Sequence, residues 1–276
     1  MTDTPFIVSA PYLEELLNQP EVVVVDCRFA LLEPELGYQQ YKKSHISGAY
    51  YLDLNKDLSS PVARHGGRHP LPNPNELAGK LAAMGINFQE TLVVAYDDSR
   101  FGFAARLWWL LRYLGHDRVS LLDGGWGGWL TQGYPVTDTM PTPKSGHFVP
   151  LIRQDWVVDI NEVKARKDLP GVVLIDSRER DRYLGEREPI DPIAGHIPGA
   201  VNYPWGLVTD EAGYVHSLGF QQQRWQDIQQ SQEAIVYCGS GVTACVNLLS
   251  LEIAGIKGGK LYAGSWSDWC SYLKVV

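Results

Sequence analysis

The fold can be inferred from residues 235–244, which read Ile235-Val236-Tyr237-Cys238-Gly239-Ser240-Gly241-Val242-Thr243-Ala244. A short apolar run, typical of a buried strand, ends at a cysteine, and two glycines then permit a tight loop. An apolar stretch of helical character follows over residues 242–254. This order places a thiol at the carboxyl end of a strand, facing the N-terminus of a helix. Backbone N–H groups that converge there favour a thiolate and can also hold an anion.

The same pattern occurs twice in the chain. Residues 22–28 read Val22-Val23-Val24-Val25-Asp26-Cys27-Arg28, and residues 172–178 read Val172-Val173-Leu174-Ile175-Asp176-Ser177-Arg178. A His-Ile-x-Gly-Ala block follows each of them, starting at His45 and His196. Residues 92–97 match 234–238, and the tryptophan-containing residues 124–129 match 264–269. Four matched blocks in the same order indicate a tandem duplication.

Each copy is predicted to be an α/β domain with a doubly wound parallel sheet. Apolar runs alternate with helical patterns at residues 75–84, 103–114 and 242–254. Continuous apolar strands between helices are typical of parallel sheets covered on both faces, where ligands bind at the carboxyl ends of strands. We expect one domain over residues 1–138 and a second over 155–276. A Pro-rich linker over residues 139–154 is expected to join them.

The cysteine loop and the duplication resemble the rhodanese-like sulfurtransferases over nearly the whole chain. The form Cys-Gly-Ser-Gly-Val-Thr is most similar to the 3-mercaptopyruvate sulfurtransferase branch. The thiosulfate branch carries basic residues at the two positions that are Gly239 and Ser240 here. The resemblance implies two tandem rhodanese-like domains. The first is expected to be catalytically silent, because Asp97 stands where the second has Cys238.

The resemblance also implies the reaction. The Cys238 thiolate takes a sulfane sulfur from 3-mercaptopyruvate, becomes a persulfide and passes the sulfur to an acceptor. Thiosulfate with cyanide as acceptor is the alternative. The expected partners are a small sulfur donor and an acceptor left open among thiols, cyanide, thioredoxin and a protein cysteine. Neither a metal nor an organic cofactor is expected.

Three further residues are implied in the chemistry. Ser240 and Thr243 are expected to bind the donor by hydrogen bonds or to relay its proton. The family's histidine partner matches His69, within Arg-His-Pro-Leu-Pro. Asn55 stands where an acid is usual, with Asp53 and Asp57 as nearby replacements. His69 has an alternative reading, in which it only holds its proline-rich loop.

The donor's anionic group requires loop N–H groups and arginines. We expect the loop residues Gly239, Gly241 and Val242 to line the binding site. Arg182, which precedes Tyr183, matches a family arginine, and an arginine fork suits a carboxylate. A second family arginine falls at Asp191, so Arg187 is the nearest replacement. The alternative for each arginine is a solvated surface charge.

Several other classes of protein are disfavoured. A net charge of −8 argues against nucleic acid as partner. No run approaches ~18 apolar residues, and the N-terminus does not resemble a signal peptide, so no membrane contact and a cytoplasmic location are expected. The four cysteines form no CxxC pair, which argues against zinc and disulfides.

Two rival functions on the same fold can be weighed from the loop. A cysteine phosphatase needs Cys-x5-Arg, but the sixth position after Cys238 is Ala244, and residues 239–250 contain no arginine or lysine. A silent binding module would not be expected to keep Cys238 in an intact glycine loop. Sulfur transfer is therefore the preferred function.

Overall fold

The computed structural model describes residues 4–231 and 233–273. The chain divides into two compact units, each of which contains a short segment from the other half of the sequence. Unit 1 comprises residues up to Ser60, Pro72–Arg153 and Glu211–Val215. Unit 2 comprises Pro61–Leu71, Gln154–Asp210 and the residues from His216 onward.

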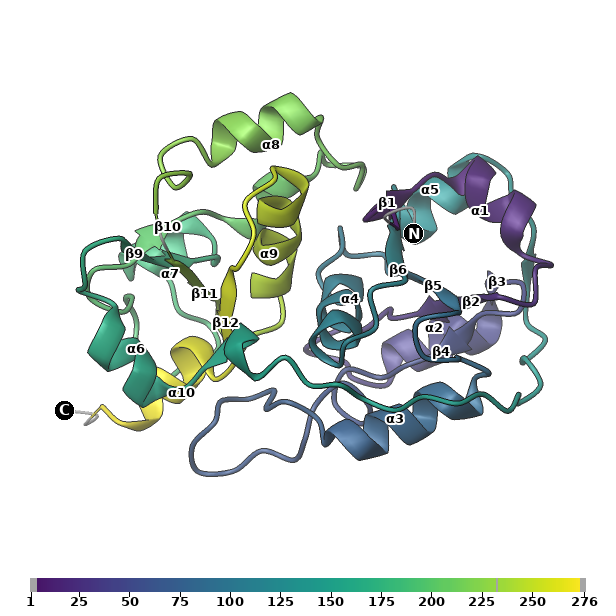
Figure 1. The fold of residues 1–276 in the computed structure, drawn as a ribbon, viewed down its shortest axis with the longest axis horizontal. Helices are drawn as coiled ribbons and strands as arrows, with labels where there is room; N and C mark the ends of the chain where they lie inside the picture. The colour runs from purple at the N-terminus through teal and green to yellow at the C-terminus, as the bar shows by residue number, and fades with distance from the viewer. Residues whose placement is uncertain (1–3, 232, 274–276) are drawn as a thin grey trace. The chain divides into compact units, whose positions relative to one another are not determined.

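Unit 1 is built around a five-stranded parallel sheet in the order β1-β6-β5-β2-β4 (Figure 1). Its strands are β1 Ile7–Val8, β2 Val22–Asp26, β4 Tyr50–Tyr51, β5 Leu92–Tyr96 and β6 Val119–Leu122. A separate antiparallel pair is formed by β3 His45–Ile46 and β7 Val136–Thr137. The helices are α1 Ala10–Leu16, α2 Leu36–Lys43, α3 Pro74–Ala83, α4 Ala104–Tyr113 and α5 Gly125–Thr131.

Unit 2 repeats this sheet, in the order β10-β9-β11-β12-β8, again parallel throughout. Its strands are β8 Val157–Val158, β9 Val172–Asp176, β10 Val201–Asn202, β11 Glu233–Tyr237 and β12 Lys260–Tyr262. The α-helices are α6 Ile160–Arg166, α7 Arg180–Leu184, α8 Leu218–Arg224, α9 Ala244–Ile253 and α10 Ser265–Ser271. Short 3₁₀ turns occur at Gln154–Trp156 and Trp205–Val208. Matching positions in the two sheets confirm the predicted fold class.

The long strands and helices lie where the apolar patterns placed them, to within one or two residues. The central strands β5 and β11 are buried along nearly their whole length, as continuous apolar runs predict. Helix α9 is buried on most of its surface, from Ala244 to Leu251, because it contacts both β11 and β12. Polar caps fix other helix starts, such as the Asp159 capping box of α6.

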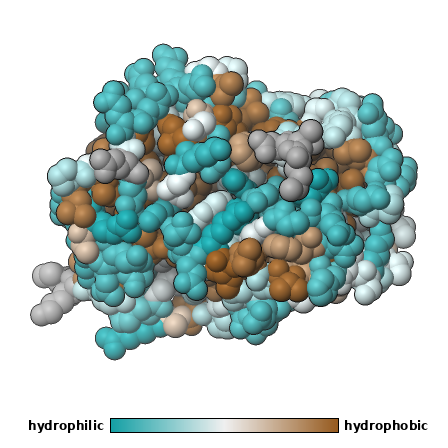
Figure 2. Space-filling model, in the orientation of Figure 1, coloured by the Kyte–Doolittle hydropathy of each residue, from teal (hydrophilic) through white to brown (hydrophobic). Residues whose placement is uncertain are grey.

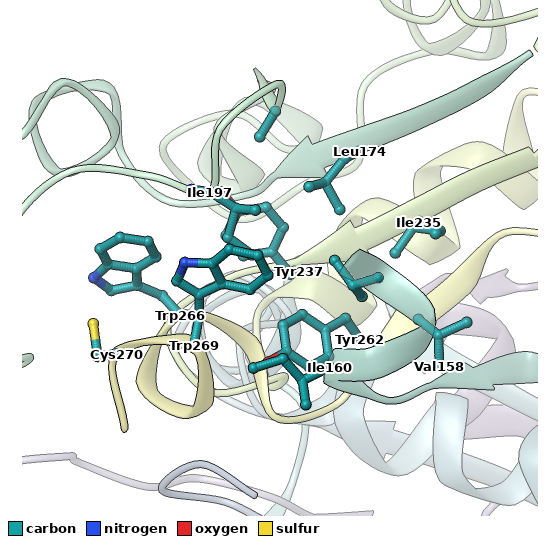
Figure 3. Close-up of a cluster of buried hydrophobic side chains, with 12 residues drawn as sticks. Val158, Ile160, Leu174, Ile197, Ile235, Tyr237, Tyr262, Trp266, Trp269 and Cys270 are labelled. Atoms are coloured by element: carbon teal, nitrogen blue, oxygen red, sulfur yellow. The ribbon is translucent and has the colours of Figure 1, made fainter. Parts of the chain in front are cut away.

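The repeated tryptophans pack in the cores. In unit 2, Trp266 and Trp269 of α10 lie in one buried cluster with Tyr237 of β11 and Tyr262 of β12 (Figure 3). In unit 1, Trp129 is buried in the matching cluster. The last strand residues before the active loop are therefore held by aromatic packing.

The repeated arginines form buried ion pairs. Arg28 pairs with Asp26 at 2.6 Å and Arg178 with Asp176 at 2.7 Å. Burial alone would lower the pKa of the Arg178 guanidinium, but Asp176 holds it above its ordinary value. These pairs lie at the carboxyl ends of β2 and β9, so both arginines stabilise the fold at the strand ends.

The segment expected to be a linker runs along unit 1. Lys144 and Gly146 donate backbone hydrogen bonds to the end of α3, and Leu151 donates to Leu114. Arg153 pairs with Asp117. Residues 139–153 therefore belong to unit 1 and are held to it by hydrogen bonds and an ion pair.

The surface drawn in Figure 2 is mostly hydrophilic, with hydrophobic residues in small scattered groups. Within residues 4–231 and 233–273, none of the helices combines the length and the hydrophobicity that crossing a bilayer would require.

Candidate active site

Cys238 follows the last residue of β11, the middle strand of the unit 2 sheet, and is 2% exposed. Its backbone N–H donates to Ser265 Oγ at 3.1 Å, and its carbonyl accepts from the N–H of Trp266 at 3.0 Å. Gly239 is held in the same way, by the N–H of Ser267 at 2.9 Å. Ser265 itself has a positive φ of 57°. The start of α10 therefore fixes the loop, at the cost of a strained residue.

The second loop glycine is required by both backbone conformation and space. Gly241 has a φ of 75°, and a Cβ at this position would lie 2.3 Å from the carbonyl oxygen of Ala263. No other residue fits this turn, which carries the chain from β11 into α9.

The turn leaves backbone donors available. In the part of the chain that the structure describes, no acceptor pairs with the N–H groups of Gly239, Ser240, Val242 and Thr243. Val242 is buried, and Thr243 directly precedes α9 without capping it through its side chain. Such a set of N–H groups beside a thiol can stabilise a thiolate, a persulfide or a bound anion.

The matching loop of unit 1 shows how this turn binds a negative charge. Asp97 follows β5 and is 1% exposed. Its carboxylate accepts four backbone hydrogen bonds of 2.7–3.1 Å, from the N–H groups of Ser99, Phe101, Phe103 and Ala104. The anion site of this copy is thus filled by its own side chain, and an aspartate stands where the second copy has Cys238.

A segment from the first half of the sequence completes the site of unit 2. Residues Pro61–Leu71 belong to this unit, where they pack against α10. The N–H of Gly66 donates to Asp268 at 2.7 Å, the N–H of Arg68 donates to Ser267 at 3.1 Å, and His65 stacks on Tyr272. These contacts hold the next residue, His69, at the cysteine loop.

His69 and Ser240 share a hydrogen bond. The distance from His69 Nδ1 to Ser240 Oγ is 2.7 Å, and the two residues are 6% and 7% exposed. The structure thus brings together three of the predicted catalytic residues: Cys238, Ser240 and His69. A buried serine–histidine pair two residues from a thiol can move a proton.

The acids considered as partners of His69 belong to unit 1 and are engaged there. Asp53 accepts from the N–H groups of Asn55 and Lys56, and Asp57 pairs with Lys80. Asn55 is exposed. These contacts account for both carboxylates within their own unit.

Two guanidinium groups border the loop. A Cβ placed on Gly239 would lie 3.1 Å from Arg68 Nη2 and 3.6 Å from Arg182 Nη1. Arg182, from α7, was predicted from the family motif. Arg68 was not, and its position beside His69 in the sequence was the only available signal.

Arg187 lies elsewhere. Its side chain is 54% exposed, and its Nε donates to Asp181 Oδ2 at 2.6 Å, on the outer side of α7. The structure therefore does not bring Arg187 to the loop. Arg187 is close to Arg182 in sequence, but its side chain is directed to Asp181 and not to the site.

Two buried carboxylates organise the site arginines. Arg182 contacts Glu188 at 2.7 Å and Asp191 at 3.3 Å, and Arg68 forms an ion pair with Asp191. Burial raises the pKa of Asp191 above its ordinary value, although Arg68 acts in the opposite direction. Burial would raise the pKa of Glu188 as well, but its hydrogen bond from Arg182 holds it below the usual range.

Metal binding finds no support in the described residues, which contain no group of three or more His, Cys, Asp or Glu side chains able to hold an ion. The chemistry of the site is that of a thiol, a serine–histidine pair, backbone donors and two guanidiniums.

Comparison with known proteins identifies the family of the chain. The "Rhodanese-like domain" model matches residues 9–132 and 159–272. A Pseudomonas aeruginosa protein named "Probable 3-mercaptopyruvate sulfurtransferase" is 44% identical, over 95% of this chain and 94% of that protein. The thiosulfate sulfurtransferase of Rattus norvegicus is 30% identical, over 95% and 91%.

A solved structure is similar along nearly the whole chain. The Escherichia coli protein SseA, described as a 3-mercaptopyruvate sulfurtransferase with the rhodanese fold, aligns with a TM-score of 0.83 at 32% identity. The alignment covers 96% of this chain and 100% of that one. The sequence match, the duplicated sheet and the cysteine loop lead to one conclusion: this chain belongs to the rhodanese-like family, with two tandem domains.

Proposed function

We propose that this protein transfers sulfur from 3-mercaptopyruvate to a thiol or cyanide acceptor through a persulfide on Cys238. The observation that carries the proposal is the convergence at one loop of a thiol, free backbone donors, the Ser240–His69 pair and two guanidiniums. The relative with 44% identity carries the same activity in its name.

The first half-reaction moves one sulfur atom and one proton. The Cys238 thiolate attacks the donor sulfur, an S–S bond forms, and the bond from that sulfur to the methylene carbon breaks. Its electron pair goes to the carbon, which becomes an enolate. The donor's thiol proton ends on this carbon, so the products are pyruvate and a Cys238 persulfide anion. The hydrogen bond between Ser240 and His69 supports this pair as the carrier of that proton.

The second half-reaction regenerates the thiolate. An acceptor thiolate or cyanide attacks the outer sulfur, the S–S bond of the persulfide breaks, and its electron pair returns to Cys238. The loop N–H groups can stabilise the charge on sulfur in both states. Small thiols, cyanide, thioredoxin and a protein cysteine fit this step equally well.

Thiosulfate is the second candidate donor, and one observation favours it. The sequence places no basic residue beside Cys238, but Arg68 and Arg182 border Gly239 in the folded protein. Two guanidiniums suit a compact dianion. Attack on thiosulfate forms the same S–S bond and expels sulfite with the electron pair, without any proton transfer.

A cytoplasmic location is part of the proposal. It is supported by the four cysteines, which are all buried and none of which forms a disulfide within the described residues, as in proteins of reducing compartments.

The test compares both donors in steady state and locates the transferred sulfur. We expect a higher kcat/KM for 3-mercaptopyruvate and a mass increase of about 32 Da on the peptide that contains Cys238, the persulfide adduct. Cys238→Ser should abolish transfer, whereas Cys245→Ser, at a buried neighbour, should retain it. Faster turnover of thiosulfate would make thiosulfate the preferred donor in place of 3-mercaptopyruvate. Sulfur found on Cys245 would contradict the mechanism.

A further inference from the structure

Asp191 occupies an unusual place for a carboxylate, behind the cations that border the cysteine loop. Its side chain is 2% exposed, and each of its oxygens faces a different guanidinium, Oδ1 toward Arg68 and Oδ2 toward Arg182. It thus joins an arginine of the segment Pro61–Leu71 to an arginine of α7.

The charges around this carboxylate can be assigned pairwise. Arg178 is satisfied by Asp176 and also touches Glu188 at 3.2 Å. Glu188 is therefore shared between Arg178 and Arg182, whereas Asp191 is directed at Arg182 and Arg68. The two guanidiniums nearest Gly239 carry two positive charges; Glu188 offsets part of the charge on Arg182, and Asp191 is the carboxylate that contacts both guanidiniums.

Arg68 keeps room for a ligand despite this pairing. Its side chain is 30% exposed, compared with 13% for Arg182, and its Nη2 is the guanidinium atom nearest to the Cβ position of Gly239, at 3.1 Å. Its Nη1 is the atom engaged by Asp191. One edge of the fork is thus held by the carboxylate while the other edge borders the loop.

We infer that Arg68 and Arg182 bind the anionic group of the sulfur donor and that Asp191, by cancelling one of their charges, makes the site prefer a monoanionic donor to a dianionic one. This inference rests on the proposed function, since it takes the donor to be an anion that reacts at Cys238. It assigns the selectivity to a carboxylate beside the loop, in addition to the residues of the loop itself.

The physical reason is the dependence of Coulomb energy on the charge of the ligand. Removing one negative charge beside the site favours a dianion by twice as much as a monoanion at the same position. Asp191→Asn retains the shape of the side chain and one acceptor oxygen. It should therefore raise the kcat/KM ratio of thiosulfate to 3-mercaptopyruvate by about tenfold or more.

A second measurement reads the charge at Cys238 without any donor. Iodoacetate and iodoacetamide alkylate a thiolate by the same displacement of iodide, but only iodoacetate is an anion. The ratio of their rates at Cys238, followed by mass spectrometry of its peptide, reports the local potential. Asp191→Asn should raise this ratio about fivefold, and Arg68→Gln should lower it by a similar factor.

The matched control is Asp181→Asn. Asp181 lies on the same helix as Arg182, and its pairing with Arg187 is exposed. The same loss of one negative charge there should leave both ratios unchanged, because solvent screens it. Equal shifts in the Asp181 and Asp191 variants would overturn the inference, since only net charge would then matter.

The outcomes separate this inference from the proposed function. An alkylation ratio that stays within twofold in folded Asp191→Asn refutes the role of Asp191, whichever donor is used. A shifted alkylation ratio in a protein that accepts neither donor refutes the proposed function and leaves the charge role standing. If Asp191→Asn does not fold, the test uses Arg68→Gln, whose substituted side chain is more exposed. An unchanged alkylation ratio in that variant would contradict the inference.

Discussion

The hydrogen bond between Ser240 and His69 gives the sharpest prediction of the mechanism, because only one of the two donors needs it. Transfer from 3-mercaptopyruvate requires that a proton reach the carbon that loses sulfur, whereas thiosulfate expels sulfite without a proton. Ser240→Ala should therefore impair the first reaction far more than the second.

The size of the effect follows from the role and the geometry. The two atoms are 2.7 Å apart in a pair that is less than a tenth exposed, so solvent is a poor substitute for either group. Positioned proton transfer contributes about 10²–10⁴ in rate, or about 2.7–5.4 kcal/mol in the activation free energy. The free energy of unfolding should fall by about 1–3 kcal/mol, the cost of leaving one partner of a buried hydrogen bond unsatisfied.

The assay is kcat for each donor in Ser240→Ala, His69→Gln and the double variant. If the pair acts as a unit, the second substitution should add less than about tenfold to the first. Ser250→Ala is the control: its buried hydroxyl contacts Trp225 and Gln221, away from the loop, so it should affect stability and leave both rates unchanged. Equal losses with both donors, or additive losses in the double variant, would refute the relay.

Three further predictions concern the loops and the pH dependence of stability. Gly241→Ala should abolish activity and lower the melting temperature, because the added Cβ meets the Ala263 carbonyl; a folded, active variant in thermal melts and assays would contradict this geometry. Asp97→Ala should destabilise unit 1 by about 2–4 kcal/mol in urea unfolding, since four backbone donors lose a charged acceptor, yet leave kcat of the folded protein within a few fold. Burial lowers the pKa of His116 to about 4, so native protein binds fewer protons than unfolded protein between about pH 4 and 6.5. Stability should therefore be lost as pH falls through this range, by at most about 3 kcal/mol, and His116→Gln should flatten the curve.

Much of the fold was predictable because its signals are local or repeated. The Val-rich runs of β2 and β9 are buried on both faces, so their apolar residues are continuous and mark strands directly. The two copies of each block indicated a duplication. In both copies the Asp-Arg pair is a buried ion pair in the structure. The position of Cys238 at the end of β11 followed from the same order of strand, glycine loop and helix.

The exchange of segments between the two halves could not be predicted in this way. Residues Pro61–Leu71 have no periodicity, and nothing local indicates that they dock on α10. Their contacts join residues about 200 positions apart, such as Gly66 with Asp268. Contacts of this kind depend on the folded shape of α10 and its surroundings. No short stretch of the sequence contains that information.

The sequence by itself therefore located the thiol of Cys238 at a strand end, the glycine loop, Asp97 at the matching place in the first copy, and Arg182 near the loop, because each follows from residue type at a fixed place in a strand–loop–helix unit. Only the tertiary structure decided the charge of the site. It brought Arg68 to Gly239, directed Arg187 outward to Asp181, and buried Asp191 between two guanidiniums. The physical reason is that electrostatic interactions act through space, so the potential at Cys238 is set by groups that folding brings near it.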